Sequence, residues 1–470
     1  MYPRTKFSES AGAVFLYILV GGILLLGYRG SFSTEQLQLY LMLMLAYFWI
    51  AGLLVVARSH YKMYVFEPLL FVGILYLAIF VIKPVVDLKY NDQLTAHGIN
   101  VLGGGAKATA IVILSFTCMF IGYYWGNESN FIDFRSSSQI DRMVEAGDKE
   151  PFSLAKLYLA WTIVFALCLI CMLSEGISLS YIFSFGSGGE RESSSNTALL
   201  FLSNFGITLV LLTEMILFNS KNIPVKVITI LLTLVYILMR NSRWLMLAFI
   251  LAPITYYFIR RRREPNGFIV LIGGLLALTV FAWMQENRYV LATGGALHGW
   301  GSGGFTFEKL LAPLESDLNT YKTFYSMVQR FPGEHAYMLG ETFLYVFLLF
   351  IPRAIWPGKP TNPVQDMIEY SLNKSARTSG TAVCNIGEMY ANFGILGCIL
   401  LMFLFGVLLS KLKVLLQSGS TDRLFAYSII YSVLFQWVAR GNFSGNFYMT
   451  IFAVLPFIVK WTWDKVFRKM

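Results

Sequence analysis

The sequence has little charge for its length. Asp, Glu, Lys and Arg make up 14% of its 470 residues, whereas a soluble globular chain has about 25%. Apolar residues take up the difference at 56%, and the mean hydropathy is +0.60. This balance excludes a water-soluble enzyme of this size. It also excludes a disordered protein, which needs low hydrophobicity and high charge. The composition therefore predicts an all-α polytopic membrane protein.

The motifs of several common chemistries are also missing. No GxxxxGK[ST] phosphate-binding loop occurs, so the sequence gives no sign of ATP as an energy source. No DxD pair and no paired-His motif appears, and the five cysteines show no CxxC or Cys/His spacing for zinc. We therefore expect no cofactor and no metal site. These absences favour a substrate that brings its own activated phosphate.

Long apolar runs dominate the chain. A membrane helix needs about 20 mostly apolar residues, and that rule predicts twelve spans: 11–28, 36–56, 65–83, 107–125, 154–173, 198–218, 223–239, 243–259, 266–285, 389–410, 424–439 and 444–462. The apolar stretch 343–351 is too short to cross, so we predict a re-entrant or surface segment. This divides the chain into helices 1–9 (1–285), a large loop (286–388) and helices 10–12 (389–470).

The net charge of +10 could suggest a nucleic-acid partner, but in a membrane protein it more often reflects basic cytoplasmic loops. The run Arg260–Arg263 should therefore lie in the cytoplasm. That choice places both termini in the cytoplasm and the loop 286–388 outside it. If 343–351 crossed fully, Lys411 and Lys413 would move to the outer side. We therefore expect twelve spans, membrane lipids as partners and no nucleic acid. The loop is rich in aromatic residues, which indicates order.

Four arginines do not fit the cytoplasmic pattern. Arg240, Arg243, Arg353 and Arg440 fall at the predicted outer ends of helices or beside the re-entrant segment. Each could pair with a carboxylate or reach lipid headgroups, since an isolated charge near lipid is costly. A guanidinium can also hold phosphate through two hydrogen bonds at once. Four arginines on one side of the membrane favour a shared anionic ligand over a separate partner for each of them.

The proline-rich segment 350–360 (FIPRAIWPGKP) breaks any helix, because proline lacks an amide hydrogen and clashes with the preceding turn. Broken backbone at membrane depth is tolerated where it lines a cavity or is buried in protein. Arg353 and Lys359 would then lie close to the break. The alternative is an interfacial anchor, with Trp356 at the headgroup level.

The segment 385–394 (NIGEMYANFG) contains a carboxylate at the start of a predicted span. Glu388 could be a general base if partial burial raises its pKa, or it could be the partner of an arginine. Tyr390 and Asn392 could bind sugar hydroxyls, while Gly394 could permit close helix packing. His335 is a second candidate base, although a lone histidine in a loop is more often solvated.

At these residues the sequence resembles the Wzy family of bacterial O-antigen and oligosaccharide repeat-unit polymerases. The resemblance rests on IPRAIWPGKP at 351–360, GEMYANFG at 387–394, NSRW at 241–244 and Arg440. It implies a GT-C-like membrane glycosyltransferase of the bacterial inner membrane that works without a metal. It also implies a substrate, an oligosaccharide on undecaprenyl diphosphate, and it makes a chain-length regulator protein a candidate partner.

The resemblance and the charge pattern together suggest roles for individual residues. We expect three side chains to hold the diphosphate, with Arg240 as a fourth candidate: Arg243, Arg353 and Arg440. Glu388 is the expected base, ahead of His335. The expected glycan contacts are Tyr390, Asn392 and Trp356.

Two other functions share many of these features. A flippase for the lipid-linked unit would need the arginines and the helices, but two related halves are common in transporters and we find none. A ligase would move the finished chain to a lipid acceptor. A deletion that leaves single repeat units on the final lipid favours a polymerase. Long undecaprenyl-linked chains would favour a ligase, and units facing the cytoplasm would favour a flippase.

Overall fold

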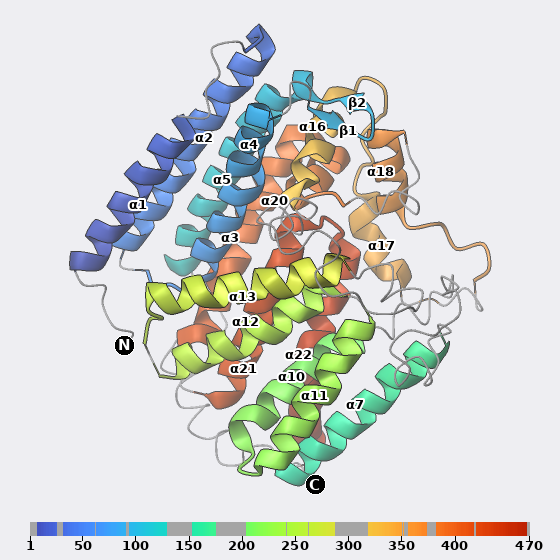
Figure 1. The fold of residues 1–470 in the computed structure, drawn as a ribbon. Coiled ribbons are helices and arrows are strands. Elements are labelled where there is room, and N and C mark those ends of the chain that lie inside the picture. Colours follow the sequence, from blue (N-terminus) through green and yellow to red (C-terminus); the bar gives the residue numbers. More distant parts are fainter. Residues whose placement is uncertain are drawn as a thin grey trace.

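The computed structural model describes residues 7–25, 32–61, 63–90, 94–128, 153–174, 204–240, 242–261, 263–286, 318–349, 351, 356–373, 382–417 and 420–467. Its elements are helical except for one two-stranded hairpin (Figure 1). They are α1 (Phe7–Leu25), α2 (Thr34–Ser59), α3 (Pro68–Leu77), π-helix η1 (Ala78–Ile82), α4 (Lys83–Tyr90), β1 (Thr95–Ala96), β2 (Ile99–Asn100), α5 (Leu102–Glu128), α7 (Leu154–Ser174), α10 (Phe205–Asn219), α11 (Ile223–Met239), α12 (Arg243–Arg260), α13 (Gly267–Glu286), α16 (Thr320–Arg330), α17 (Glu341–Leu349), α18 (Pro363–Leu372), α20 (Asn385–Gln417), α21 (Thr421–Ala439) and α22 (Phe443–Phe467).

Each span predicted from the sequence overlaps a helix, and α11 has the predicted bounds. Among the described residues, six helices are long and apolar enough to cross a membrane: α2, the α3–α4 rod, α5, α7, α20 and α22. Shorter apolar helices accompany them, including α10 and α11. The outward faces carry large apolar side chains such as Leu41, Ile228 and Leu400, as expected for helices that face lipid. The protein is an all-α polytopic membrane protein.

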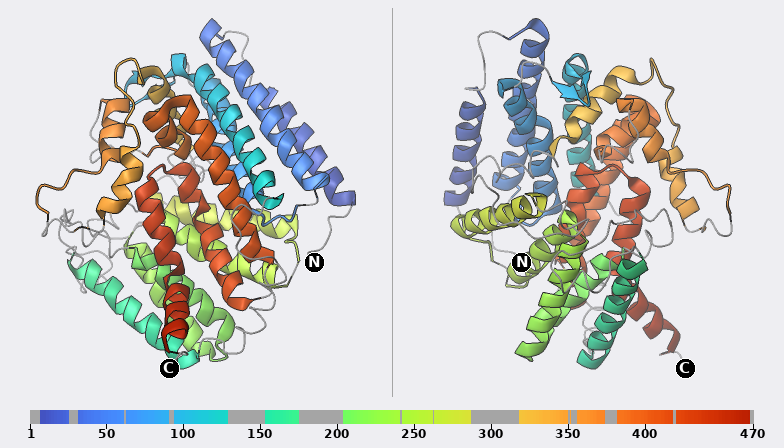
Figure 2. Two further views of the ribbon diagram at one scale, coloured as in Figure 1. Left: turned by 180° about the vertical axis from the view of Figure 1, so that it is seen from behind. Right: turned by 45° about the vertical axis from the view of Figure 1, so that its right-hand side comes forward.

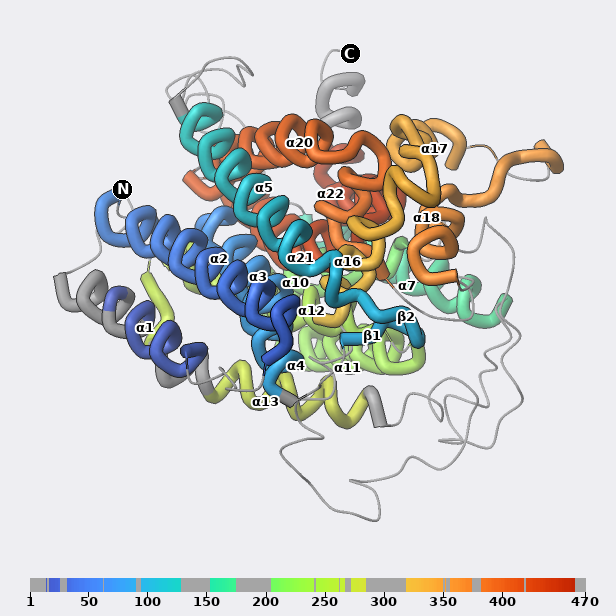
Figure 3. Tube along the Cα trace, turned by 90° about the horizontal axis from the view of Figure 1, so that it is seen from above, coloured from blue at the N-terminus to red at the C-terminus, as the bar shows by residue number. Residues whose placement is uncertain are grey.

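The centre of the bundle is the pair α5 and α20, which run side by side (Figure 3). Their backbones approach closely because a glycine of each helix faces the backbone of the other. A Cβ on Gly122 would overlap the carbonyl of Phe403, and one on Gly406 would overlap the carbonyl of Met119. Small residues let membrane helices pack at short range, where dispersion contacts are strongest. The other helices pack around this pair.

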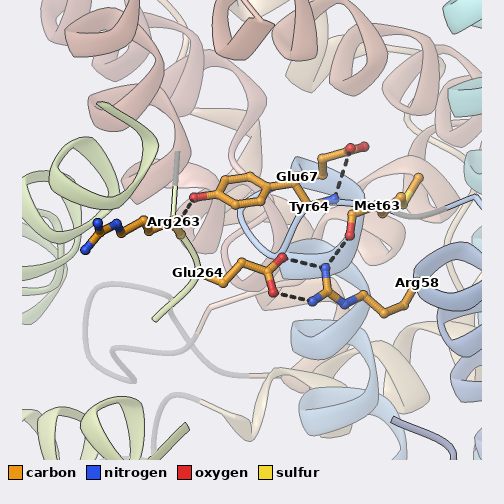
Figure 4. Close-up of polar contacts among 6 residues, drawn as sticks. All are labelled: Arg58, Met63, Tyr64, Glu67, Arg263 and Glu264. Carbon is orange, nitrogen blue, oxygen red and sulfur yellow. Dashed lines mark hydrogen bonds and ion pairs between the residues drawn. The ribbon is translucent and has the colours of Figure 1, made fainter. Parts of the chain in front are cut away.

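At the basic end of the bundle, which carries Arg260, Arg261 and Arg263, polar contacts tie the α2–α3 and α12–α13 connections to each other and to α5 and α20. The guanidinium of Arg58 donates to both oxygens of Glu264, at 2.8 and 2.6 Å (Figure 4). Tyr64 donates to the carbonyl of Arg263 at 2.5 Å. Glu67 accepts from the hydroxyl of Tyr123 on α5 at 2.7 Å and pairs with a lysine of α20. We call Arg58, Met63, Tyr64, Glu67 and Glu264 the basic-end clasp.

The rod formed by α3, η1 and α4 contains a change of helical phase. Pro84 lacks an amide hydrogen and would clash with the preceding turn of an α-helix. The chain relieves this clash with the π-turn Ala78–Ile82. A π-turn adds one residue, so the positions after it rotate by about 100° around the axis. As a result Lys83 and Asp87 both face the protein interior, where they are buried.

The end opposite the basic end is covered by a cap, which we define as the β1–β2 hairpin, α16, α17, α18 and residues 385–394 of α20. Figure 2 shows α17 and α18 beside the upper parts of α20 and α22. The predicted re-entrant stretch forms α17, and Tyr448 of α22 donates to its Val346 carbonyl at 2.6 Å. The hairpin packs on α16. The cap therefore contains most described residues of the predicted loop 286–388.

Candidate functional site

The segment GEMYANFG forms the first two turns of α20 and ends at a break. Gly394 has φ 64° and ψ −152°, a backbone conformation that residues other than glycine rarely adopt. Its Cα hydrogen also makes room for Tyr337, whose hydroxyl oxygen would lie 2.8 Å from an added Cβ. The break separates a short helix in the cap from the long remainder of α20. The sequence suggested that this glycine could permit close helix packing. The structure adds a second role, which is to let the chain change direction.

The short helix holds the connection between α16 and α17. The amides of Met338 and Leu339 donate to the carbonyls of Ala391 and Asn392, both at 3.0 Å. Tyr390 is buried, and its hydroxyl donates to the Phe331 carbonyl at 3.1 Å. Backbone groups buried in this connection cannot bond to water, so these hydrogen bonds satisfy them instead. They fix the cap on the end of α20 that lies opposite the basic end.

Asn392 is at the centre of this arrangement. It is fully buried, and its side-chain oxygen accepts from the amide of Gly340 at 3.0 Å. Its nitrogen donates to the hydroxyl of Thr342 at 2.9 Å and to the carbonyl of Glu388 at 2.7 Å. In this structure Tyr390 and Asn392 thus bind protein groups. The contact with sugar hydroxyls expected for them stays a prediction.

Glu388 lies on the same short helix, at 3% exposure. Both carboxylate oxygens accept from the amide of Phe443, at 3.1 and 3.0 Å. Phe443 is the first residue of α22, so this carboxylate caps that helix from a distant part of the chain. A negative charge at a helix N-terminus is favourable, because the first amides have no partner within the helix. Glu388 thereby holds the turn that contains Arg440.

That turn, residues 440–443, packs against the start of α20. The amide of Gly441 donates to the carbonyl of Val383. The carbonyl of Arg440 accepts from the side-chain nitrogen of Asn446 at 2.7 Å. Arg440 is exposed on this fixed backbone. A rigid backbone under an exposed guanidinium is suited to binding an anion at a defined place.

Two of the predicted arginines lie at matching heights on neighbouring helices. Tyr256 of α12 stacks on Phe425 of α21 with ring centroids 3.9 Å apart. The two helices run in opposite directions, because the contacts of α10 show it parallel to α12 and antiparallel to α21. At 1.5 Å per residue, Arg243 lies about 20 Å from this contact and Arg440 about 22 Å, both toward the cap. Arg240 is one short turn before α12, at the same end. The structure therefore brings three of the four arginines to one end of the bundle.

Arg353 lies outside the described residues, as do the rest of 352–355 and Asn241. Lys359 of the same proline-rich motif is described and is buried. Its ammonium donates to the carbonyl of Ile351 at 2.9 Å and lies 5.6 Å from the ring centre of Tyr345. The motif therefore folds back onto the end of α17. Trp356, in contrast, is 40% exposed.

His335 is half-buried in the middle of the α16–α17 connection. Its ring stacks on Tyr370 of α18, with centroids 4.7 Å apart and planes 18° apart. Arg330 donates to the carbonyl of Tyr370 at 3.0 Å and so ties the end of α16 to α18. His335 is more accessible than Glu388, but no described contact joins the two candidate bases.

A charged cluster at the cap end was not predicted from the sequence. Asp87 accepts from Lys83 at 2.6 Å and pairs with Lys322 at 3.2 Å, and Tyr321 donates to it. The spacing of Lys83 and Asp87, four residues apart at the end of an apolar run, is a signal that could have drawn attention to it. Among the described residues, no group of three potential metal ligands occurs.

The comparison with curated proteins and that with solved structures give no match. A family model does match: that of the O-antigen polysaccharide polymerase Wzy, over residues 12–469. This range includes every helix after the first turns of α1 and both motifs of the cap. The chain therefore belongs to the Wzy family of O-antigen polysaccharide polymerases.

Proposed function

We propose that this polymerase joins oligosaccharide repeat units carried on undecaprenyl diphosphate. The growing chain leaves its own diphosphate and is transferred to a hydroxyl of an incoming lipid-linked unit, and undecaprenyl diphosphate is released. The reaction takes place at the cap end, at the extracytoplasmic face of the bacterial inner membrane, with both termini in the cytoplasm. The observation that carries the proposal is the matching height of Arg243 and Arg440 on α12 and α21.

The chemistry of the leaving group explains the arginines. When the glycosyl bond breaks, negative charge grows on a diphosphate at the membrane surface. Fixed guanidinium groups stabilise that charge without reorganising, and they act most strongly in the transition state. Each charge-assisted hydrogen bond contributes about 1.5–3 kcal/mol. Arg243 and Arg440 hold the diphosphate in this proposal, with Arg353 and Arg240 as further contacts, and they supply the charge that a metal would otherwise provide.

The acceptor hydroxyl needs a base, and Glu388 is our proposal because it lies directly under the turn that carries Arg440. His335, beside Tyr370, is the alternative. Trp356 is the exposed aromatic residue for stacking on a sugar. Tyr390 and Asn392 belong to the same short helix, and their glycan contacts require the cap to rearrange when substrate binds.

The direct test uses purified protein and a synthetic undecaprenyl-diphosphate-linked repeat unit, with the products resolved as a ladder on a gel. We expect the ladder to persist in the presence of a chelator. Arg243→Lys and Arg440→Lys keep the charge but lose the planar fork, so both should shorten the ladder. Arg261→Lys is the matched control, because Arg261 is exposed at the opposite end of α12. If Arg243→Lys and Arg440→Lys give ladders as long as that of Arg261→Lys, the proposal is contradicted.

Glu388→Gln separates a chemical role from a structural one. Glutamine keeps an oxygen that can accept from the amide of Phe443, so α22 stays capped, but it cannot take a proton. If Glu388 is the base, the turnover rate should fall by about 10²–10⁴-fold while the unfolding temperature changes little. If the rate stays near that of the wild type, Glu388 is a positioning residue and His335 becomes the candidate to replace next.

A further inference from the structure

The outward side of α18 in the cap is polar, unlike the apolar outward faces of the long helices. Its inward side chains, such as Met367 and Leu372, are buried against the protein. Its outward side presents Asp366, Glu369 and Tyr370, which are neighbours on the helix surface at spacings of three and four residues. We call these three side chains the α18 face. Glu369 and Tyr370 are exposed and Asp366 is half-buried, so a ligand can reach the face directly from solvent.

Tyr370 is held in a fixed position although it is 40% exposed. One face of its ring stacks on His335, with centroids 4.7 Å apart. Arg330 donates to its carbonyl and also to the side-chain oxygen of Asn373, at 2.6 Å, and so holds the end of α18. Among the residues that the structure describes, none stacks on the other face of the ring. That free face is a rigid, flat apolar surface, which loses little conformational entropy when a ligand packs on it.

The two carboxylates place hydrogen-bond acceptors beside this ring. Within the described part of the chain, neither Asp366 nor Glu369 forms an ion pair. Partial burial and the charge of Glu369 raise the pKa of Asp366. Hydroxyl groups that donate to both carboxylates would offset this repulsion, because a hydrogen bond to an ionised oxygen is about twice as strong as a neutral one. A phosphate would instead be repelled, so the face favours neutral, hydroxyl-rich ligands.

This combination of groups is suited to a sugar. One side of a pyranose ring consists largely of C–H groups that pack on an aromatic face, and the hydroxyl groups at its rim can donate to carboxylate oxygens. The α18 face also belongs to the same packed unit as the candidate site. Phe331, whose carbonyl accepts from Tyr390, has its ring 5.9 Å from that of His335.

We propose that the α18 face binds a sugar of the oligosaccharide repeat unit, with the sugar ring on Tyr370 and its hydroxyl groups on Asp366 and Glu369. The identity of this ligand rests on the proposed function, in which Arg243 and Arg440 hold the diphosphate of a lipid-linked unit. Charge then sorts the two ends of the substrate, because the anionic end is attracted to the arginines and repelled by the acidic face. The face sets the affinity for the repeat unit and takes no part in the chemical step.

The test uses the oligosaccharide released by mild acid from the lipid-linked repeat unit, which carries neither phosphate nor lipid. Its Kd for purified full-length protein in detergent is measured by saturation-transfer NMR. We expect Tyr370→Ala to weaken binding about tenfold, whereas Tyr370→Phe keeps the ring and should bind as the wild type does. Glu369→Gln should weaken binding about fivefold, because the acceptor loses its charge.

Tyr257→Ala is the matched control. Tyr257 is also 40% exposed, but it lies near the end of α12 that carries Arg260. This variant should bind the oligosaccharide as the wild type does. The unfolding temperature of each variant shows that it is folded. In the polymerisation assay, Tyr370→Ala should raise the KM for the repeat unit about tenfold, with a smaller change in kcat.

Three outcomes would overturn the proposal: no binding to the wild type, an unchanged Kd in Tyr370→Ala, and loss of binding in EDTA, which would mean that the carboxylates hold a cation instead of hydroxyl groups. The proposed function fails separately. If Tyr370→Ala weakens binding while Arg243→Lys and Arg440→Lys still give full ladders, the α18 face stands and the arginine assignment falls. If the oligosaccharide does not bind but the arginine variants shorten the ladder, the reverse holds.

Discussion

Replacing Gly394 by alanine tests whether the break in α20 is required. Alanine at φ 64° and ψ −152° occupies a region that costs about 1–3 kcal/mol outside glycine. The new methyl group would lie 2.8 Å from the Tyr337 hydroxyl oxygen and 2.9 Å from its ring carbon, so this side chain must move. Overpacking of that kind adds about 1 kcal/mol at a half-buried residue that can give way. The expected loss is therefore about 2–4 kcal/mol.

The effect should be largest in the cap, because Tyr337 packs edge-on against Tyr390, with centroids 6.0 Å apart. Purified Gly394→Ala should unfold at a lower temperature in detergent and should give a shorter polymer ladder. Gly273→Ala is the matched control, since Gly273 lies inside α13 with nothing within 4 Å of an added Cβ. There alanine should be neutral or stabilising by about 0.5–1 kcal/mol. If Gly394→Ala behaves like this control, the break has no role in stability or polymerisation.

Three further predictions concern buried or half-buried groups. Tyr390→Phe leaves the Phe331 carbonyl without its donor and should cost about 1–3 kcal/mol, seen as a lower unfolding temperature in detergent. Arg58→Met should destabilise the basic-end clasp by about 1–3 kcal/mol because Glu264 loses its partner, and adding Glu264→Gln should recover part of that loss in a double-mutant cycle. Burial raises the pKa of the Cys384 thiol to about 12, so at pH 8 only about one thiol in 10⁴ is ionised. A variant retaining Cys384 alone among its cysteines should resist maleimide when folded and react on unfolding; rapid labelling of the folded protein would refute its burial.

The sequence predicted the helices well because lipid imposes one rule on every span. Backbone groups in hydrocarbon must bond within the segment, so each long apolar run becomes a helix. This is why 223–239 matches α11 and why the short run before Pro352 forms α17. Successive spans alternate in direction, so counting them is enough to predict that Arg243 and Arg440 lie at one end of the bundle. The same counting does not predict which residues are buried in the cap.

The remaining features depend on contacts between distant residues. Gly394 sits in an apolar run where glycine also favours close packing, so its positive φ left no distinct signal. Glu388 could be a base or an arginine partner on sequence grounds, and its bond to Phe443 required the fold. Asp87 and Lys322 are far apart in the chain and meet through a π-turn that the apolar pattern does not reveal. Periodicity reports which face is buried, but not what it is buried against.

The contact between α5 and α20 constrains how a lipid substrate reaches the protein. The carbonyls of Phe403 and Met119 touch the glycines of the opposite helix, so at these positions no space for a lipid tail exists between the two helices. Opening a gap there would expose two backbones to hydrocarbon along their length, with no donors to replace those lost. In the reaction proposed above, the lipid tails of the substrates would therefore have to approach from other sides of the bundle.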